Sequence, residues 1–397
     1  MVPFSPVEVT SALVEQTLEL FEQDCSASPR VFFAPGRANL GGAHMDYNGG
    51  KVMPAALSRG TCIALSPRTD GLLRLRSAQF PGETAEVPIA DLRPGRTKSW
   101  SAYSEGALYY AAQAWGDLPG LDIFVNADLP MGRGLSSSAS VECGMVFAVS
   151  KLLEVDANVD EMIRLAHRAE NEYVGVRCGI LDQAAIFLAK ADSILLFDCL
   201  ELTREHLPFP SEKVAIAILD SGVQRELANS AFNERVAECT RALALLQEEL
   251  PGVTCLRDVK RRDFEDQKDL LPPNLARRVE HVVSEFERTN IASRALRNGN
   301  LAGFGATLSS AHESLKTNYE VSTPELDTLV EAAQSVEGCL GSRLTGAGFG
   351  GCTVSVVSAD RQEDFSAIVP EVYERKTGRK TKVDWFHPFS GPEEISL

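Results

Sequence analysis

The sequence lacks several features that mark whole classes of protein. None of its apolar stretches approaches the roughly 20 consecutive apolar residues of a membrane-spanning helix. Its nine cysteines are scattered singly, with no CxxC pair, which argues against a disulfide framework and a zinc site. The opening segment contains acidic residues and no long apolar run, so we expect no signal peptide. Together these absences predict a soluble, cytoplasmic protein that does not enter a membrane.

Positive charge is also scarce. The 397 residues include 39 basic and 55 acidic side chains, for a net charge of −16. Such a field repels nucleic acid and anionic membranes, so we expect neither as a partner. A small anionic substrate stays compatible with this balance, because a local pocket can oppose the global charge. The GK[ST] ending of a Walker A loop is missing as well, and no GxGxxG follows a first strand.

The order of predicted elements indicates an α+β fold. The length favours two domains, and helices and strands follow one another without a regular βαβ alternation. Up to residue 100 the sequence is rich in short strand candidates, among them KVMPAALS and TCIALSPR as separate strands. Long amphipathic helices are expected at 231–250 and 274–298. The pattern changes near ELTREHLPFPSEK, so we place domains at 1–205 and 206–397.

Three glycine-rich segments are the most informative stretches. They are GRANLGGAHMDYNGG at 36–50, DLPMGRGLSSSASVECG at 128–144, and RLTGAGFGGCTVSVV at 343–357, which we expect between a helix and a strand. In the second, glycines free the backbone to fold round a ligand, and small hydroxyl residues then open a helix. Exposed N–H groups and the dipole at such a helix start favour phosphate. On the residues alone, an ordinary N-cap or a packing turn remains an alternative for each segment.

An aspartate in the stretch CGILDQ has two interpretations. Asp182 lies in an otherwise apolar context after a Cys-Gly turn. A partly buried aspartate can be a general base or a magnesium ligand. It can equally be the N-cap of the helix that follows.

The three glycine-rich segments together resemble the signature motifs of the GHMP kinases, small-molecule kinases unrelated to Walker A enzymes. The first is similar to the galactokinase signature, whose usual form is GRVNLIGEHTDYNGG, and CGILDQ and HESLKTNYEVSTPELDTLVEAA at 312–333 match that family too. The resemblance implies a ribosomal-protein-like N-terminal domain, a ferredoxin-like C-terminal domain, and an active site in the cleft between them. It also implies a sugar 1-kinase that uses ATP and Mg²⁺. The residues leave the oligomeric state open, and we expect a monomer.

The resemblance assigns site residues position by position. Asp182 matches the catalytic aspartate and Arg37 the arginine beside it, while Ser138 and Glu170 match the magnesium ligands. A positioned carboxylate can accept the proton of the acidic anomeric hydroxyl, and the arginine can keep that carboxylate ionised and stabilise the transferring phosphoryl group. The expected sugar-binding positions are Arg37, Ala43, His44, Asp46, Gly179, Asp182 and Phe232. The expected ATP-binding positions are Pro130, Gly132, Gly134, Leu135, Ser136, Ser137, Ser138, Ala139, Gly346 and Gly348.

Ala43 departs from the galactokinase signature, which has a glutamate that reaches the hydroxyl on the sixth carbon of the sugar. Losing a hydrogen bond to a charged group costs galactose about 1.5–3 kcal/mol. Removing a glutamate also removes a repulsion on the order of 4 kcal/mol from any carboxylate at that carbon. Galacturonokinases carry GAH here and RSAQF downstream, as at 76–80, so the closest resemblance is to them. The expected product is therefore α-D-galacturonate 1-phosphate.

Several alternatives stay open. D-galactose is one, and L-arabinose, which lacks the sixth carbon, is another. Phe232 stands where a tyrosine is usual, which removes a polar contact to the sugar, and Arg225 is the one cation we can suggest for a substrate carboxylate. Outside the enzymes, some galactokinase-like proteins are inactive sugar and ATP sensors. The presence of Arg37, Ser138, Glu170 and Asp182 argues against that role.

Overall fold

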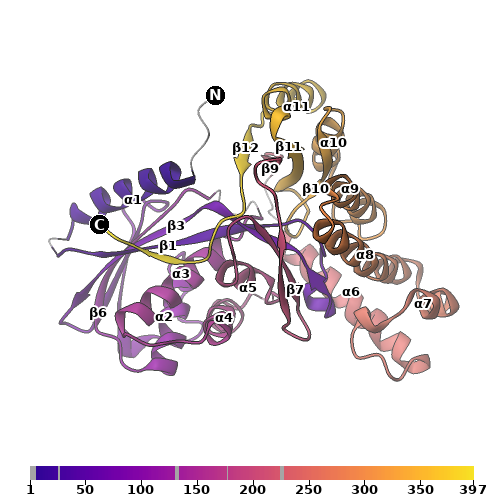
Figure 1. Cartoon of the computed structure of the whole chain (residues 1–397). Coiled ribbons are helices and arrows are strands. Elements are labelled where there is room, and N and C mark those ends of the chain that lie inside the picture. Colours follow the sequence, from indigo (N-terminus) through magenta and orange to yellow (C-terminus); the bar gives the residue numbers. More distant parts are fainter. Residues whose placement is uncertain (1–5, 26, 130–133, 177, 224–227) are drawn as a thin grey trace.

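The computed structural model describes residues 6–25, 27–129, 134–176, 178–223 and 228–397. The chain forms two lobes joined side by side (Figure 1). The described helices and strands mix in each lobe without a βαβ alternation, which confirms the predicted α+β class.

A six-stranded sheet forms the centre of the first lobe, in the order β13-β1-β3-β6-β4-β5. Helix α1 covers one face of the sheet, and α2 to α5 cover the other (Figure 1). Phe32 packs with the second set of helices, whereas Val31 and Phe33 pack with Phe21 of α1, because successive strand residues point to opposite faces. The bounds are α1 Pro6–Glu22, β1 Arg30–Asn39, β3 Pro54–Arg68, β4 Leu72–Ser77, β5 Thr84–Pro88, α2 Ala102–Trp115, β6 Gly120–Ala127, α3 Ser137–Leu152, α4 Val159–Arg168, a π-helix Ala169–Val174, α5 Leu181–Phe187 and β13 Glu393–Ile395.

The second lobe contains an antiparallel sheet in the order β10-β11-β9-β12, which is the strand order of a ferredoxin-like domain. A three-stranded sheet, β2-β7-β8, precedes it in the chain. The bounds are β2 Lys51–Val52, β7 Ser193–Asp198, β8 Arg204–Pro208, β9 Val214–Asp220, α6 Ala228–Glu249, α7 Arg261–Gln267, α8 Pro273–Arg297, α9 Leu301–Thr317, α10 Pro324–Gln334, β10 Cys339–Leu344, β11 Cys352–Ser358, α11 Gln362–Thr377 and β12 Val383–Phe386.

Two expectations about single elements are wrong. KVMPAALS and TCIALSPR are not two strands, because residues 54–68 form the single strand β3. Gly60 lies inside that strand, where a Cβ would come within 2.0 Å of the Ala34 carbonyl oxygen, so this glycine permits close strand approach and does not end the strand. The third glycine-rich segment follows a strand, since residues 339–344 form β10.

The boundary near residue 205 stays a prediction. It falls inside β8, which pairs with β7, and the last strand, β13, returns to pair with β1 of the first lobe. We therefore propose that the chain passes to the second lobe between β8 and β9 and comes back at its end.

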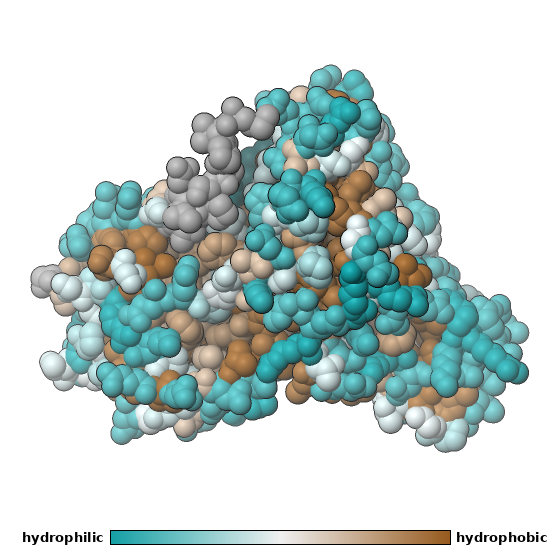
Figure 2. Space-filling view, in the orientation of Figure 1, coloured by the Kyte–Doolittle hydropathy of each residue, from teal (hydrophilic) through white to brown (hydrophobic). Residues whose placement is uncertain are grey.

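In the described part of the chain, no helix is both long enough and apolar enough to cross a membrane. On the face shown in Figure 2, hydrophilic residues prevail over both lobes and apolar residues form small patches, some of them where the lobes meet. Scattered apolar residues of this kind are normal on a folded protein.

Candidate active site

A cavity of about 410 Å³ is lined by residues from both lobes. The lobes are tied beside it, because the Asn39 amide donates to Thr345 Oγ1 at 3.1 Å and the Thr345 hydroxyl donates back to the Asn39 carbonyl at 3.3 Å. The lining residues are Arg37, Asn39, His44, Asp46, Gly134, Ser136, Ser137, Ser138, Val176, Cys178, Gly179, Leu181, Asp182, Phe232, Gly346 and Ala347.

Asp182 is held at both carboxylate oxygens. Arg37 Nε donates to Oδ1 at 2.8 Å, and the Ser136 hydroxyl donates to Oδ2. Arg37 Nη1 also donates to the Gly134 carbonyl at 2.6 Å, and this second hydrogen bond orients the guanidinium group. Asp182 is the second residue of α5, after the N-cap Ile180, so the N-cap interpretation of this aspartate is wrong. A carboxylate fixed in this way inside a cavity suits a general base.

Ser136 is the N-cap of α3, yet its side chain makes no capping hydrogen bond. Its φ is +58°, a left-handed backbone conformation that serine seldom adopts. Backbone strain of this kind persists where the surrounding structure enforces it, often at functional sites. Here the conformation accompanies the hydrogen bond to Asp182, so Ser136 joins the phosphate-loop candidate to the base.

The first glycine-rich segment brings polar side chains to the cavity. Burial lowers the pKa of His44 to about 3, so its ring is neutral near pH 7, and Nδ1 lies 2.9 Å from the Tyr47 hydroxyl. Burial and the charge of Asp182 raise the pKa of Asp46 to about 6. A Cβ at Gly179 would lie 2.2 Å from an Asp46 carboxylate oxygen, so only glycine fits there without a shift. The structure thus gathers His44, Asp46 and Gly179 as the sequence predicts.

Of the two remaining sugar-binding candidates, Phe232 lines the cavity and Ala43 does not. Phe232 lines the cavity from α6, with its ring centroid 5.9 Å from that of His44. Ala43 is buried and is not among the lining residues. Its amide and that of Gly42 both donate to Glu285 Oε1 at 3.0 Å, which holds this part of the segment against α8. Arg225 lies outside the described residues.

The predicted ATP positions divide into three groups. Gly134, Ser136, Ser137, Ser138 and Gly346 line the cavity. Leu135 and Ala139 are buried in the hydrophobic core, and Gly348 packs against the backbone of Val321, where a Cβ would meet the carbonyl oxygen at 2.3 Å. Pro130 and Gly132 lie outside the described residues.

Ser138 and Glu170 carry oxygen donors of the kind that magnesium prefers. The Ser138 hydroxyl donates to Glu170 Oε1 at 3.0 Å, and Gln183 Nε2 donates to Oε2 at 2.6 Å. Burial and the charge of Asp182 raise the pKa of Glu170, and burial and Glu170 raise that of Glu142, which has Oε1 unpartnered within the described chain. A divalent cation would relieve this crowding of buried acids.

The described residues hold no group of three or more His, Cys, Asp or Glu side chains placed to bind a metal ion. Magnesium does not require one, because it keeps several waters and is bound through one or two protein groups plus substrate phosphates. The donor set of a serine hydroxyl and one carboxylate therefore matches Mg²⁺ in complex with a nucleotide.

Glu170→Gln is expected to raise the Mg²⁺ concentration that gives half-maximal activity by roughly 10- to 100-fold, because a charged oxygen is replaced by a neutral one. Initial rates over a Mg²⁺ titration measure this. The control is Glu172→Gln, whose carboxylate is half-exposed and pairs with Arg168 on the surface. An unchanged half-saturation in Glu170→Gln would contradict the ligand assignment.

Sequence reasoning missed several residues near the site. Asn39, Val176, Cys178, Leu181 and Ala347 line the cavity. Their neighbours in the motifs could have indicated them, since each lies within a few residues of an assigned position. Glu285 on α8 offered no such signal, because it is one acid among many in a charged amphipathic helix.

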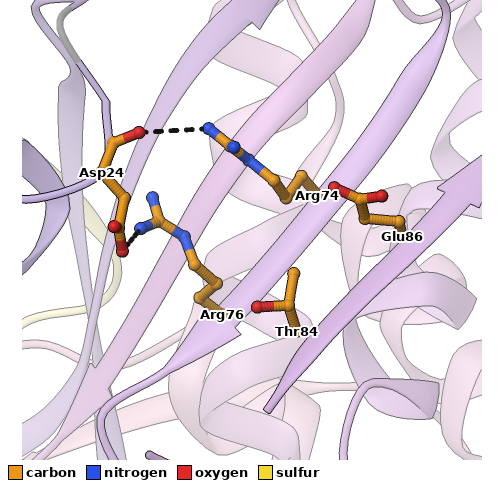
Figure 3. A pocket seen from close by; sticks show the side chains of 5 residues that line it. All are labelled: Asp24, Arg74, Arg76, Thr84 and Glu86. Carbon is orange, nitrogen blue, oxygen red and sulfur yellow. Dashed lines mark hydrogen bonds and ion pairs between the residues drawn. The ribbon is translucent and has the colours of Figure 1, made fainter. Parts of the chain in front are cut away.

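A second hollow, of about 440 Å³, lies away from this cavity and is lined by Asp24, Arg74, Arg76, Thr84 and Glu86 (Figure 3). Arg76 forms an ion pair with Asp24, and Arg74 Nη2 donates to the Asp24 carbonyl at 3.3 Å. Arg76 begins the RSAQF stretch, and none of residues 76–80 is among the described residues that line the 410 Å³ cavity. The stretch therefore contributes no direct contact there.

Comparisons with known proteins show which family the chain is similar to. Family models match the chain at 19–67 (galactokinase galactose-binding signature), 102–190 (GHMP kinases N terminal domain) and 292–375 (GHMP kinases C terminal). A galactokinase of Roseiflexus sp. (strain RS-1) is 41% identical over 366 residues, which cover 92% of this chain and 93% of that protein. A galactokinase of Bacillus subtilis (strain 168) is 39% identical over 352 residues, 88% of this chain and 90% of that protein.

A solved structure is similar over nearly the whole chain. The crystal structure of Lactococcus lactis galactokinase complexed with galactose matches with a TM-score of 0.91 and 36% identity, covering 98% of this chain and all of that one. Methanococcus jannaschii mevalonate kinase shares the fold, with a TM-score of 0.66 at 19% identity over 92% of this chain. The three galactokinases among these proteins support the galactokinase family, and the finer resemblance to galacturonokinases stays a prediction. The chain belongs to the galactokinase family of the GHMP kinases, phosphotransferases that use ATP and an alcohol acceptor.

Proposed function

We propose that this kinase transfers the γ-phosphoryl group of ATP to the anomeric hydroxyl of a sugar of galactose configuration. The observation that carries this proposal is the arrangement of Asp182, held by Arg37 and Ser136, in a cavity that His44 and Asp46 also line. The side chains on one wall suit sugar hydroxyls, and the start of α3 on another suits phosphates.

In the proposed reaction, Asp182 accepts the proton of the anomeric hydroxyl as that oxygen attacks the γ-phosphorus. A new O–P bond forms while the bond to the bridging oxygen breaks, and ADP leaves with the electron pair of that bond. Arg37 and the amides at the start of α3 stabilise the charge on the transferring group. Mg²⁺ held by Ser138 and Glu170 would neutralise the phosphate charge.

D-galactose is the substrate that the names of the relatives support. D-galacturonate is the second candidate, and Ala43 is the observation that favours it. A glutamate at this position would repel a carboxylate on the sixth carbon, and alanine does not. Both sugars present the same anomeric hydroxyl to Asp182. The enzyme can therefore distinguish them only by contacts to the sixth carbon.

The test is a comparison of kcat/KM for D-galactose, D-galacturonate, L-arabinose and D-glucuronate with ATP and Mg²⁺. We expect at least one of the first three to be phosphorylated at the anomeric oxygen, as seen by ³¹P NMR of the product. D-glucuronate differs in ring configuration and is expected to react poorly. If none of the four consumes ATP, the proposed function fails and the sensor interpretation replaces it.

A further inference from the structure

A buried cluster of charges lies behind the sugar-binding segment and takes no part in the proposed reaction. Glu285 and Arg288 come from α8, and Arg343 comes from β10. Arg288 Nε donates to Glu285 Oε2 at 2.7 Å. Arg343 Nη1 lies 3.6 Å from Glu285 Oε1, the atom that also accepts the amides of Gly42 and Ala43. The cluster is therefore in direct contact with the backbone at position 43.

The charges of this cluster do not balance. One carboxylate faces two guanidinium groups, so one positive charge is in surplus. Arg288 is bonded directly to the carboxylate, whereas Arg343 is fully buried and both of its terminal nitrogens lack a hydrogen-bond partner within the described chain. Its Nε donates to the Leu344 carbonyl at 2.9 Å. Burying a cation with open N–H groups is unfavourable unless an anion meets it. Within the described chain the open donors are both terminal nitrogens of Arg343 and Nη2 of Arg288.

The positive charge of Arg343 acts on His44, which lines the cavity. Besides burial and His281, it contributes to the lowered pKa of His44. Two residues after Arg343, the Thr345 hydroxyl bonds the backbone of Asn39, another lining residue. Strand β10 thus leads from the buried cation directly into the cavity.

The galactokinase signature resembles this segment but has glutamate where this chain has Ala43. A glutamate there would add a second carboxylate beside the two guanidinium groups and balance the cluster. We infer that Arg343 is a specificity-determining residue, and that its unmatched charge favours a sugar with a carboxylate on the sixth carbon over one with a hydroxymethyl group. This rests on the proposed sugar 1-kinase function. Arg343 is fully buried and is not among the residues that line the cavity, so its charge would act on such a carboxylate by Coulomb attraction and not by a direct hydrogen bond.

Arg343→Met tests the inference, because it removes the charge and keeps a long side chain, while Glu285 and Arg288 remain as a balanced pair. We expect kcat/KM for D-galacturonate to fall by about 10-fold or more, because the Coulomb attraction of a nearby buried cation is lost, with kcat/KM for D-galactose little changed. The matched control is Arg297→Met, which removes an exposed cation paired with Glu205 on the same lobe. It should leave the ratio of the two sugars unchanged.

Ala43→Glu gives a second measurement that does not depend on the folding of the first variant. It supplies the missing carboxylate, and it should lower the galacturonate-to-galactose ratio by a similar factor. The inference is overturned if the wild-type enzyme phosphorylates D-galactose or L-arabinose in preference to D-galacturonate, or if either folded variant leaves that ratio unchanged. Each of these results keeps the sugar 1-kinase function, whereas absence of turnover with every sugar removes the function itself.

Discussion

Replacing Asp182 with asparagine is expected to lower kcat by at least about 10²–10⁴-fold, the usual contribution of a general base. Asparagine has the same shape, but its amide cannot accept the proton of the anomeric hydroxyl. Because the change leaves the start of α3 intact, ATP should still bind with near wild-type affinity. Initial rates and calorimetric titration with ATP measure the two properties separately.

The control for this prediction is Asp160→Asn, in which an exposed carboxylate that pairs with Arg204 is neutralised in the same way. It should keep wild-type kcat. Full activity of Asp182→Asn would remove the assignment of the base. Loss of ATP binding together with activity would show instead that the hydrogen bonds from Arg37 and Ser136 need the charge to hold the loop.

Glu285→Ala is expected to reduce the free energy of unfolding by about 3–5 kcal/mol, as is typical when one partner of a buried ion pair is removed. The change leaves the guanidinium groups of Arg288 and Arg343 facing each other without an anion, and it deprives two backbone amides of their acceptor. Urea unfolding at pH 7 measures the loss. Glu287→Ala on the same helix removes a half-exposed pair with Arg261 and should cost only about 0–1 kcal/mol.

The destabilisation caused by Glu285→Ala should become smaller as the pH falls. Burial alone would raise the pKa of Glu285, but Arg288, His281 and Arg343 outweigh it and lower the pKa to about 2, from an ordinary value of 4.5. The stabilisation from the ionised group is thus complete above pH 4.5 and disappears as pH falls toward 2. The difference between wild type and Glu285→Ala should therefore shrink between pH 5 and pH 2. A constant difference over that range would show that packing, and not charge, explains the effect.

Much of the site could be predicted from short stretches of sequence. Arg37, His44, Asp46, Ser138, Gly179 and Asp182 all belong to motifs in which the order of glycine and polar residues is informative, and all of them line the cavity. The reason is local: a glycine-rich turn fixes the path of the backbone over a few residues, and that path directs the polar side chains next to it. The mixed α+β class follows from similarly local periodicity.

Errors arose where a partner distant in sequence decides the outcome. Gly60 resembles the end of a strand, but the neighbouring strand β1 makes it part of a continuous one. The sequence places Ser136 in the phosphate-loop candidate, but it gives no sign that the hydroxyl bonds a carboxylate 46 residues away. Local propensity cannot anticipate such contacts, because they depend on how the elements pack.

The sequence by itself determined the family motifs, the positions of the proposed catalytic pair, Arg37 and Asp182, and the absence of a glutamate at position 43. Only the tertiary structure showed which side chains pack behind Ala43. Glu285 and Arg343 lie more than 240 residues from Ala43 in the chain. Arg343 opens the third glycine-rich segment, but nothing in the sequence indicates that either side chain packs behind Ala43. They meet it because α8 and β10 pack against the sugar-binding segment, where Arg343 is fully buried, and burial strengthens the effect that we propose for its unmatched charge on the substrate.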